Sequence, residues 1–393
     1  MRRLTIVAAV AVAPVLVGAL AACSGRADEA PEPDWQEVSL PLPPGPAGRV
    51  AVRQAAHCAD AWYVVGGVFL AEPTADQDSR PAAWRSTDGR TFAPVPITAT
   101  TYWGQRAILA SVACSGDRIT AVGARSGGAH GNPRVTTFAQ QGSGGTTTLH
   151  DVVAAFSQYG GDKATNVGPI AGGDHGWLIT GNRTSGPAVW TSATGVDFVR
   201  HEETAGLADT AGFTALAQAA AWDGSRWVVV GGGNVRGKLD REPAAWTSPD
   251  GEGWQREAVK GGEGFDDLER PVRTGSGVLA LGLRGDSFGV WRREDGRWKT
   301  AGTFGHVRSD ASGSPFVAAL VGDGKDLWAT TSDGARYALW NSADGDDWAR
   351  VETPAAPPGT AGDHVLSVAA DGGDVLLLAD DGESGRLWRA GRG

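Results

Sequence analysis

A repeated unit of roughly fifty residues is the feature that most constrains the fold of this chain. Each copy has a short apolar stretch ending in an aromatic residue, then a polar turn with Gly, as in AAWRSTDGRTF (82–92) and AAWTSPDGEGW (244–254). Successive anchor aromatics are 45 to 56 residues apart. They are Trp84, Phe138, Trp190, Trp246, Trp291, Trp340 and Trp388. A repeat of this length predicts an array of similar structural units.

Each unit is predicted to contain four short strands. A second apolar run precedes the anchor aromatic, as in RWVVVGG (226–232), and a third ends in a Gly/Asp turn, as in FVAALVGDGKD (316–326). Apolar runs of this length, bounded by turn signals, indicate buried strands that are too short to be core helices. We therefore predict an all-β chain that forms a seven-bladed β-propeller of four-stranded antiparallel blades.

The last unit lacks its fourth strand. It has three strands, at about 364–369, 375–379 and 386–390, and then the chain ends. The segment DWQEVSLP (34–41) places Trp35 where the missing outer strand has an aromatic residue. Pairing this N-terminal strand with the last blade closes the ring and leaves no open sheet edge. The propeller is therefore predicted to occupy residues 34–393.

The N-terminus has the pattern of a secretory signal. A basic start, Met1-Arg2-Arg3, precedes an apolar stretch that ends in LAAC (20–23). This end resembles the lipobox of bacterial lipoproteins, which implies that a signal peptide (1–22) is removed and that Cys23 carries the lipid, such as palmitate. Residues 23–33 then form a lipidated Cys and a flexible tether. The alternatives are an uncleaved anchor or ordinary secretion.

The two remaining cysteines, Cys58 and Cys114, are predicted to form a disulfide. In an oxidising compartment a pair of thiols is expected to be oxidised. Both lie at equivalent places in neighbouring units, which brings them close around the axis. The alternative is two separately buried thiols.

Three of the turns share a Ser-x-Asp-Gly pattern, at 86–89, 248–251 and 342–345. The pattern resembles the Asp-box of sialidase-type (BNR-repeat) propellers, except that Gly here follows Asp directly. The third unit has Thr194 in the Asp position, the fifth shortens the turn, and the second has lost the pattern. The resemblance implies a propeller fold and places these turns away from the family's catalytic face.

The resemblance does not extend to a catalytic site. Sialidases use three arginines, a Tyr/Glu pair and an Asp, yet only Arg53 and Arg106 are candidates for the arginines. Of the four tyrosines, Tyr63 and Tyr337 lie in or beside predicted strands, and two lie in loops. We predict no catalytic residue, although the enzyme question stays open. The seven histidines are scattered, so we predict no metal site and no cofactor.

Charge excludes one class of partner. The net charge is −10, and no basic stretch stands out, so nucleic-acid binding is not expected.

A binding face is predicted where the longest loops gather. In a propeller, the loops between blades and those after each second strand share one face, opposite the Ser-x-Asp-Gly turns. The candidate residues on this face are Tyr102, Trp103, Arg106, Tyr159, Arg236 and Asp240. The same loops also carry His130, Asp162, Lys163, Lys238, Asp266 and Asp267.

Tyr102 and Trp103 are the sharpest candidates because both lie outside the anchor positions of the repeat. Aromatic residues beside charges are what protein and glycan surfaces use. The alternative is that Trp103 plugs one mouth of the channel.

These observations favour a lipid-anchored, monomeric protein on the outer face of a bacterial cell membrane. Its predicted role is a non-catalytic scaffold that binds a protein or a cell-envelope glycan. One alternative is a sialidase-like glycoside hydrolase or lyase acting on an extracellular glycan. Another is an assembly factor for an envelope protein complex.

Overall fold

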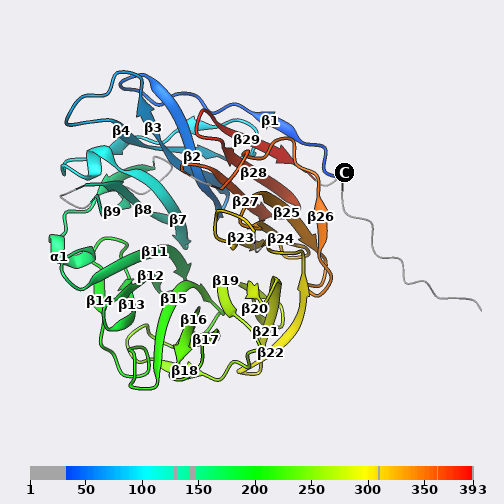
Figure 1. Ribbon diagram of the computed structural model, residues 1–393. Coiled ribbons are helices and arrows are strands. Elements are labelled where there is room, and N and C mark those ends of the chain that lie inside the picture. Colours follow the sequence, from blue (N-terminus) through cyan, green and yellow to red (C-terminus); the bar gives the residue numbers. More distant parts are fainter. Residues whose placement is uncertain (1–31, 128–130, 142–146, 309, 361, 392–393) are drawn as a thin grey trace, which may run out of the picture.

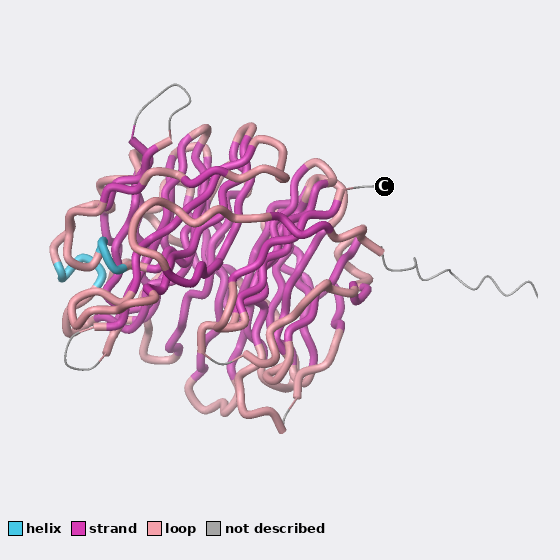
Figure 2. Tube along the Cα trace, turned by 90° about the horizontal axis from the view of Figure 1, so that it is seen from above, coloured by secondary structure: helices cyan, strands magenta, loops and turns pink. Residues whose placement is uncertain are grey.

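Seven antiparallel sheets surround a central axis in the computed structural model, which describes residues 32–127, 131–141, 147–308, 310–360 and 362–391 (Figure 1). Seen at right angles to that view, the sheets stand side by side as the blades of a disc (Figure 2). The predicted signal peptide, Cys23, most of the tether and His130 lie outside the described residues.

Each blade begins at its innermost strand. Blades 1 to 3 contain β2 (Gly48–Cys58), β3 (Ala61–Leu70), β4 (Ser79–Ser86) and β5 (Ala93–Pro94); β7 (Ile108–Ser115), β8 (Arg118–Ser126), β9 (Pro133–Gln141) and β10 (Thr148–Asp151); and β11 (Ala164–Gly173), β12 (Gly176–Arg183), β13 (Gly186–Ser192) and β14 (Val199–His201). Blades 4 and 5 contain β15 (Phe213–Trp222), β16 (Trp227–Val235), β17 (Arg241–Ser248) and β18 (Gln255–Glu257); and β19 (Asp266–Thr274), β20 (Gly277–Arg284), β21 (Ser287–Glu294) and β22 (Arg297–Phe304). Blades 6 and 7 contain β23 (Phe316–Gly322), β24 (Leu327–Ser332), β25 (Tyr337–Ser342) and β26 (Ala349–Val351); and β27 (Val365–Asp371), β28 (Asp374–Asp380), β29 (Gly385–Ala390) and β1 (Gln36–Val38).

The core lies between neighbouring blades. Second strands such as β12 are buried along their whole length, because blades cover both faces of the sheet. This is why those strands appear in the sequence as continuous apolar runs. The anchor aromatics Trp84, Phe138, Trp190, Trp246 and Trp291 are buried in these interfaces.

The N-terminal strand closes the ring, as predicted. β1 pairs with β29 in antiparallel register, with Glu37 opposite Trp388. β1 is therefore the fourth strand of blade 7. Just before it, the Trp35 indole N–H donates to the carbonyl of Glu352 at 3.0 Å.

Blade 2 has a fifth strand that the repeat did not predict. β6 (Ile97–Thr98) lies parallel to β10, with Leu149 opposite Ile97. The chain leaving blade 1 therefore runs along the outer edge of blade 2 before it turns inward to β7. This pairing fixes the start of the loop that carries Tyr102 and Trp103.

The Ser-x-Asp-Gly turns are held by their own side chains. The Ser86 hydroxyl accepts the N–H of Gly89 at 3.0 Å, and Asp88 Oδ1 accepts the N–H groups of Arg90 and Thr91, each at 2.8 Å. These backbone donors lower the pKa of Asp88 to about 2. Gly89 has φ +66°, which favours glycine. The turn chemistry follows the prediction, whereas kinship with the sialidase-type family stays a prediction.

The Cys58–Cys114 disulfide is present. It joins the last residue of β2 to β7, across blades 1 and 2, with α-carbons 5.7 Å apart. Within the described part of the chain, no helix is long and apolar enough to span a membrane.

Candidate binding groove

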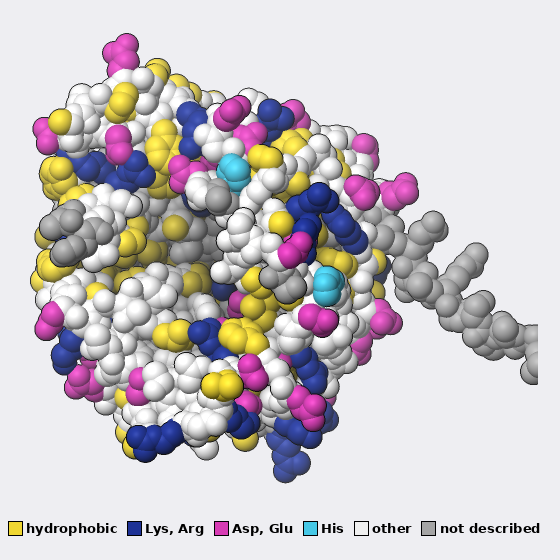
Figure 3. Space-filling model, in the orientation of Figure 1, with side chains coloured by type: hydrophobic (Ala, Val, Ile, Leu, Met, Phe, Trp, Pro, Cys, Tyr) yellow, Lys and Arg dark blue, Asp and Glu magenta, His cyan; other side chains and the backbone are white. Residues whose placement is uncertain are grey.

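A concave site lies between blades 2 and 3, on the face opposite the Ser-x-Asp-Gly turns. A cavity of about 510 Å³ is bounded by strand ends of blade 2 on one side and by α1 (Phe156–Tyr159) and the start of β11 on the other. A second cavity of about 160 Å³ adjoins it and shares Arg134, Phe156 and Tyr159 with it. We call the two cavities together the blade 2–3 groove. In Figure 3, hydrophobic side chains border a hollow in the left half of this face.

The loop that forms one lip of the groove is anchored to blade 2. Asp151, at the end of β10, accepts the N–H groups of Thr100 and Thr101 at 2.9 and 2.7 Å and both of their hydroxyls. Burial raises the pKa of Asp151, but these hydrogen bonds outweigh burial and leave it below its usual range. The Thr101 hydroxyl in turn accepts the N–H of Gly104, which starts a 3₁₀ turn (Gly104–Arg106). The lip is therefore ordered before any ligand binds.

Three of the predicted residues meet on this lip. The rings of Tyr102 and Trp103 form an edge-to-face pair with centroids 4.8 Å apart. The guanidinium of Arg106 stacks 3.5 Å from the centre of the Tyr102 ring and donates to the Tyr102 carbonyl at 2.5 Å. Arg106 is itself buried, so its role is to support Tyr102, which is 52% exposed.

Arg134 lies between two aromatic rings of the groove. Its guanidinium is 4.5 Å from the centre of the Phe156 ring and 6.0 Å from that of Trp103. Phe156 is 60% exposed, and among the described residues no carboxylate forms an ion pair with Arg134. The sequence analysis missed both residues. Phe156 carried a usable signal, because it is an aromatic residue outside the anchor positions, whereas nothing distinguishes Arg134 from the other arginines.

The opposite lip is α1, which blade 3 holds in place. The Trp190 indole N–H donates to the Gln158 carbonyl at 2.8 Å, and the Gln158 amide donates to the Phe198 carbonyl at 2.5 Å. Tyr159 is buried against Trp190, with ring centroids 5.8 Å apart, and burial raises its pKa to about 12. Tyr159 therefore lines the groove as a neutral wall rather than as an exposed contact.

The other predicted residues lie elsewhere. Arg236 and Asp240 are exposed on the β16–β17 loop of blade 4, outside the groove. Lys238, on the same loop, pairs with Glu242 at 2.5 Å, and Lys163 pairs with Glu203 at 2.7 Å. The exposed Asp162 precedes Lys163.

Two of the predicted acids, Asp266 and Asp267, are buried rather than displayed. Asp267 accepts a hydrogen bond from Arg241 at 2.6 Å. Burial raises the pKa of both carboxyls. These acids support the junction of blades 4 and 5 and do not contribute to a binding face.

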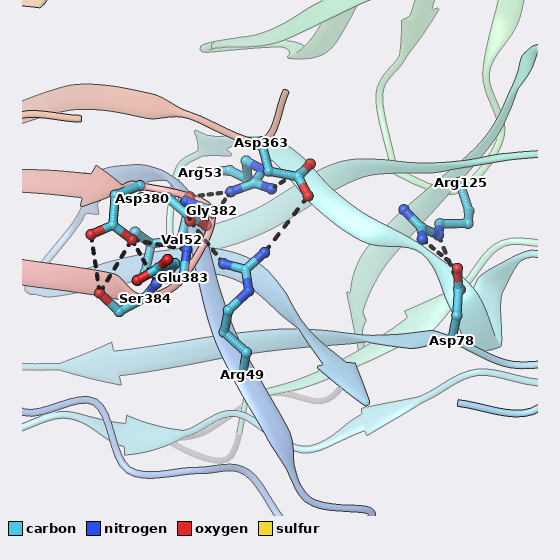
Figure 4. A network of polar contacts seen from close by, with 11 residues as sticks. Arg49, Val52, Arg53, Asp78, Arg125, Asp363, Asp380, Gly382, Glu383 and Ser384 are labelled. Carbon is cyan, nitrogen blue, oxygen red and sulfur yellow. Dashed lines mark hydrogen bonds and ion pairs between the residues drawn. The ribbon is translucent and has the colours of Figure 1, made fainter. Parts of the chain in front are cut away.

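Arginines at the front of blade 1 are already paired with acids of blade 7 and of the chain leading into it. Arg49 and Arg53, both on β2, contact Asp380 at 2.8 and 2.6 Å, and both also lie near Asp363 (Figure 4). Asp380 is fully buried. Arg53, a candidate for binding a substrate carboxylate, therefore has its charge balanced by Asp380.

Neighbouring groups at the front of the ring are also engaged. Arg125 forms an ion pair with Asp78 (Figure 4). The hydroxyl of Tyr337, a residue that a sialidase mechanism would need as a nucleophile, donates to the His364 carbonyl at 3.0 Å. Across the described ranges, no three His, Cys, Asp or Glu side chains are grouped to hold a metal ion.

One buried acid crosses the seam between blades 5 and 6. Glu269, on β19, accepts the backbone N–H of Val317 at 2.5 Å. Burial, assisted by the nearby charge of Asp267, raises the pKa of Glu269 to about 8. Glu269 thus holds the innermost strands of two blades together.

Comparison with known proteins supports the fold. No protein-family model and no curated protein sequence matches this chain. The β-propeller domain of the Trilobed protease from Pyrococcus furiosus is 10% identical, with a TM-score of 0.50 over 87% of this chain and 95% of that one. Pyrococcus horikoshii acylaminoacyl peptidase is 12% identical, with a TM-score of 0.51 over 87% of this chain and 52% of that one. Trypanosoma rangeli sialidase is 12% identical, with a TM-score of 0.47 over 91% and 58%.

Identities this low establish the fold alone. The chain spans about half the length of the peptidase and less than two thirds of the sialidase. The protein is therefore a β-propeller with a groove between blades 2 and 3. What the groove does must be argued from its own residues.

Proposed function

We propose that this protein is a non-catalytic binding scaffold, anchored by a lipid on Cys23 to the outer face of a bacterial cell membrane. Its ligand, a partner protein or a cell-envelope glycan, binds in the blade 2–3 groove. The observation that carries this proposal is the Arg134–Phe156 stack at the lip of a cavity of about 510 Å³. A concave pocket with aromatic walls and few polar groups is typical of a binding site.

Exposed apolar side chains on the rim of the groove support the proposal. Tyr102, Val153, Phe156 and Val199 belong to the exposed large hydrophobic residues of the described chain. The first three lie on the loops that flank the groove, and Val199 begins the strand beside α1. Apolar side chains gathered at one place on a surface mark an interaction site.

The hydrolase alternative has no comparable support. The candidate arginine Arg53 is paired with Asp380, and the Tyr337 hydroxyl is hydrogen-bonded to a backbone carbonyl. The assembly-factor alternative is a special case of protein binding, and the same groove would serve it.

Retention of envelope material by groove variants tests the binding role. The purified chain is immobilised and exposed to envelope extract of the source organism, and the retained proteins and glycans are identified. Phe156→Ala is expected to reduce retention of the specific ligand about tenfold or more, as loss of an aromatic hot-spot residue does. Leu239→Ala, which removes an exposed apolar residue from blade 4, serves as the matched control. Equal retention by both variants would remove the groove from the proposal.

The anchor is tested separately. Cells expressing the wild-type chain and Cys23→Ser are fed an alkyne-tagged fatty acid and then fractionated. We expect label and membrane association in the wild type and loss of both in the variant. A labelled Cys23→Ser protein would contradict lipidation at this residue.

A further inference from the structure

We propose that the blade 2–3 groove binds an extended acidic peptide segment of a partner protein. This inference rests on the proposed function, because it names the ligand class of the same groove. Three features carry it: an arginine without an acidic partner, an apolar sub-pocket beside it, and an open strand edge along one wall.

The arginine supplies charge complementarity. Arg134 has no carboxylate partner among the described residues, although the whole chain carries a net charge of −10. Most other arginines on this face, such as Arg49 and Arg125, are paired with acids. The stack on Phe156 leaves the edge of the planar guanidinium available for a carboxylate and holds the side chain in place, which lowers the entropy cost of binding. An acidic side chain is the ligand group that fits it.

The sub-pocket supplies a place for an apolar side chain. The smaller cavity measures about 160 Å³ and is lined by Trp103, Val152, Ala154, Phe156 and Tyr159, among others. This volume suits one large apolar side chain rather than a polymer. Arg134 borders the same cavity. An acidic residue on Arg134 and an apolar residue in the sub-pocket would therefore be close together in the bound segment.

The open edge of β11 supplies backbone partners. In blade 3 the strand order is β11-β12-β13-β14, so one edge of β11 has no strand beside it in that sheet. The first residues of β11, Ala164, Thr165 and Asn166, are exposed and line the larger cavity. An extended peptide can pair with such an edge through its own N–H and C=O groups. A saccharide has no regular row of these groups, so the edge favours a peptide.

Selection from a displayed peptide library tests this inference on the full chain purified in detergent. Random heptapeptides are selected on the wild type, and the affinity of a selected peptide is then measured for each variant. We expect enrichment of Asp or Glu next to a large apolar residue. Arg134→Gln should weaken the selected peptide about tenfold, as loss of one partner of an interfacial charge pair does. Arg236→Gln, which removes the same charge from blade 4, should leave the affinity unchanged.

A second variant separates the two contacts. Selection on Phe156→Ala should lose the apolar preference and keep part of the acidic one, while the melting temperature of each variant reports that it remains folded.

Several results would overturn the inference. They are no enrichment above background, an unchanged affinity in Arg134→Gln, and equal losses in Arg134→Gln and Arg236→Gln. Displacement of the selected peptide by an oligogalacturonate, with no displacement by the neutral sugar made by reducing its carboxylates, would assign the groove to an acidic glycan. In that case the proposed binding role would stand and the peptide assignment would fail. Envelope retention that ignores Phe156→Ala would instead count against the proposed role itself.

Discussion

Cys58 is bonded to Cys114, and this bond joins the innermost strands of blades 1 and 2. The two residues are 56 positions apart in the chain, so the bond encloses the whole of blade 1 after its first strand. It lies at the opposite end of β7 from the groove, whose wall includes Ala110 and Ser111 of the same strand. The disulfide thus fixes a strand that helps to form the binding site.

Removal of this bond should destabilise the protein. A loop of this length is expected to contribute about 4 kcal/mol through the lost entropy of the unfolded chain. We expect Cys58→Ser/Cys114→Ser to lower the free energy of unfolding by about that amount in denaturant titrations. Reduction of the wild type with dithiothreitol should produce the same loss, and should leave the double variant unaffected. An unchanged unfolding midpoint in both experiments would contradict a stabilising bond.

Glu269 should make stability fall as pH rises. Its pKa is about 8 in the folded protein, against 4.5 for an ordinary Glu, so the folded state keeps a proton that the unfolded state releases. Between pH 5 and 8 the contribution of Glu269 to stability should therefore decrease, by on the order of 1 kcal/mol per pH unit. Glu269→Gln has no proton to lose and can still accept from the Val317 N–H.

The measurement is the free energy of unfolding at several pH values for the wild type and Glu269→Gln. The difference between the two should change with pH in favour of the variant as pH rises. Parallel curves would show that Glu269 titrates alike in the folded and unfolded states.

Asp88 should stabilise blade 1 through its turn. Its carboxylate accepts two backbone N–H groups that would otherwise lack a partner within the turn. Asp88→Ala is expected to lower the free energy of unfolding by about 1 kcal/mol. The exposed Asp162 provides a control of equal charge, and Asp162→Ala should have little effect. Because the folded pKa of Asp88 is about 2, its contribution should persist at pH 5 and be lost as pH falls from 3.8 toward 2.

The N-terminal strand should be required for a closed ring. Without residues 34–41, β29 would expose an unpaired edge in blade 7. We expect this deletion to cause self-association, visible by size-exclusion chromatography, and to lower the melting temperature. Deletion of residues 24–31, which precede the described chain, controls for shortening of the tether. A monomeric deletion variant with an unchanged melting temperature would show that ring closure is dispensable.

Local patterns were sufficient to predict most of the fold. The period of the anchor aromatics, the turn signals and the incomplete last unit together predicted the seven blades and the pairing of β1 with β29, which the structure confirms. They succeed because each blade is stabilised largely by short-range hairpins and by contacts with its neighbours, so each copy of the repeat carries the same information. β6 escaped prediction, because a two-residue strand has no periodicity to detect.

The candidate site was only partly predictable. Tyr102, Trp103 and Arg106 were predicted together and do meet, because they lie within one short loop. Arg236 and Asp240 were grouped with them only through a shared face, and they lie on a different blade.

The sequence alone thus determined the architecture and the turns, because those depend on residues close together in the chain. Only the tertiary structure decided which charges are available for a ligand. Arg134 and Arg49 look alike in the sequence, yet one stacks on Phe156 at the edge of a cavity and the other is paired with Asp380, more than three hundred residues away. Such pairings depend on how the ring closes in three dimensions, since the energy of a charge is set by the groups around it rather than by its neighbours in the chain.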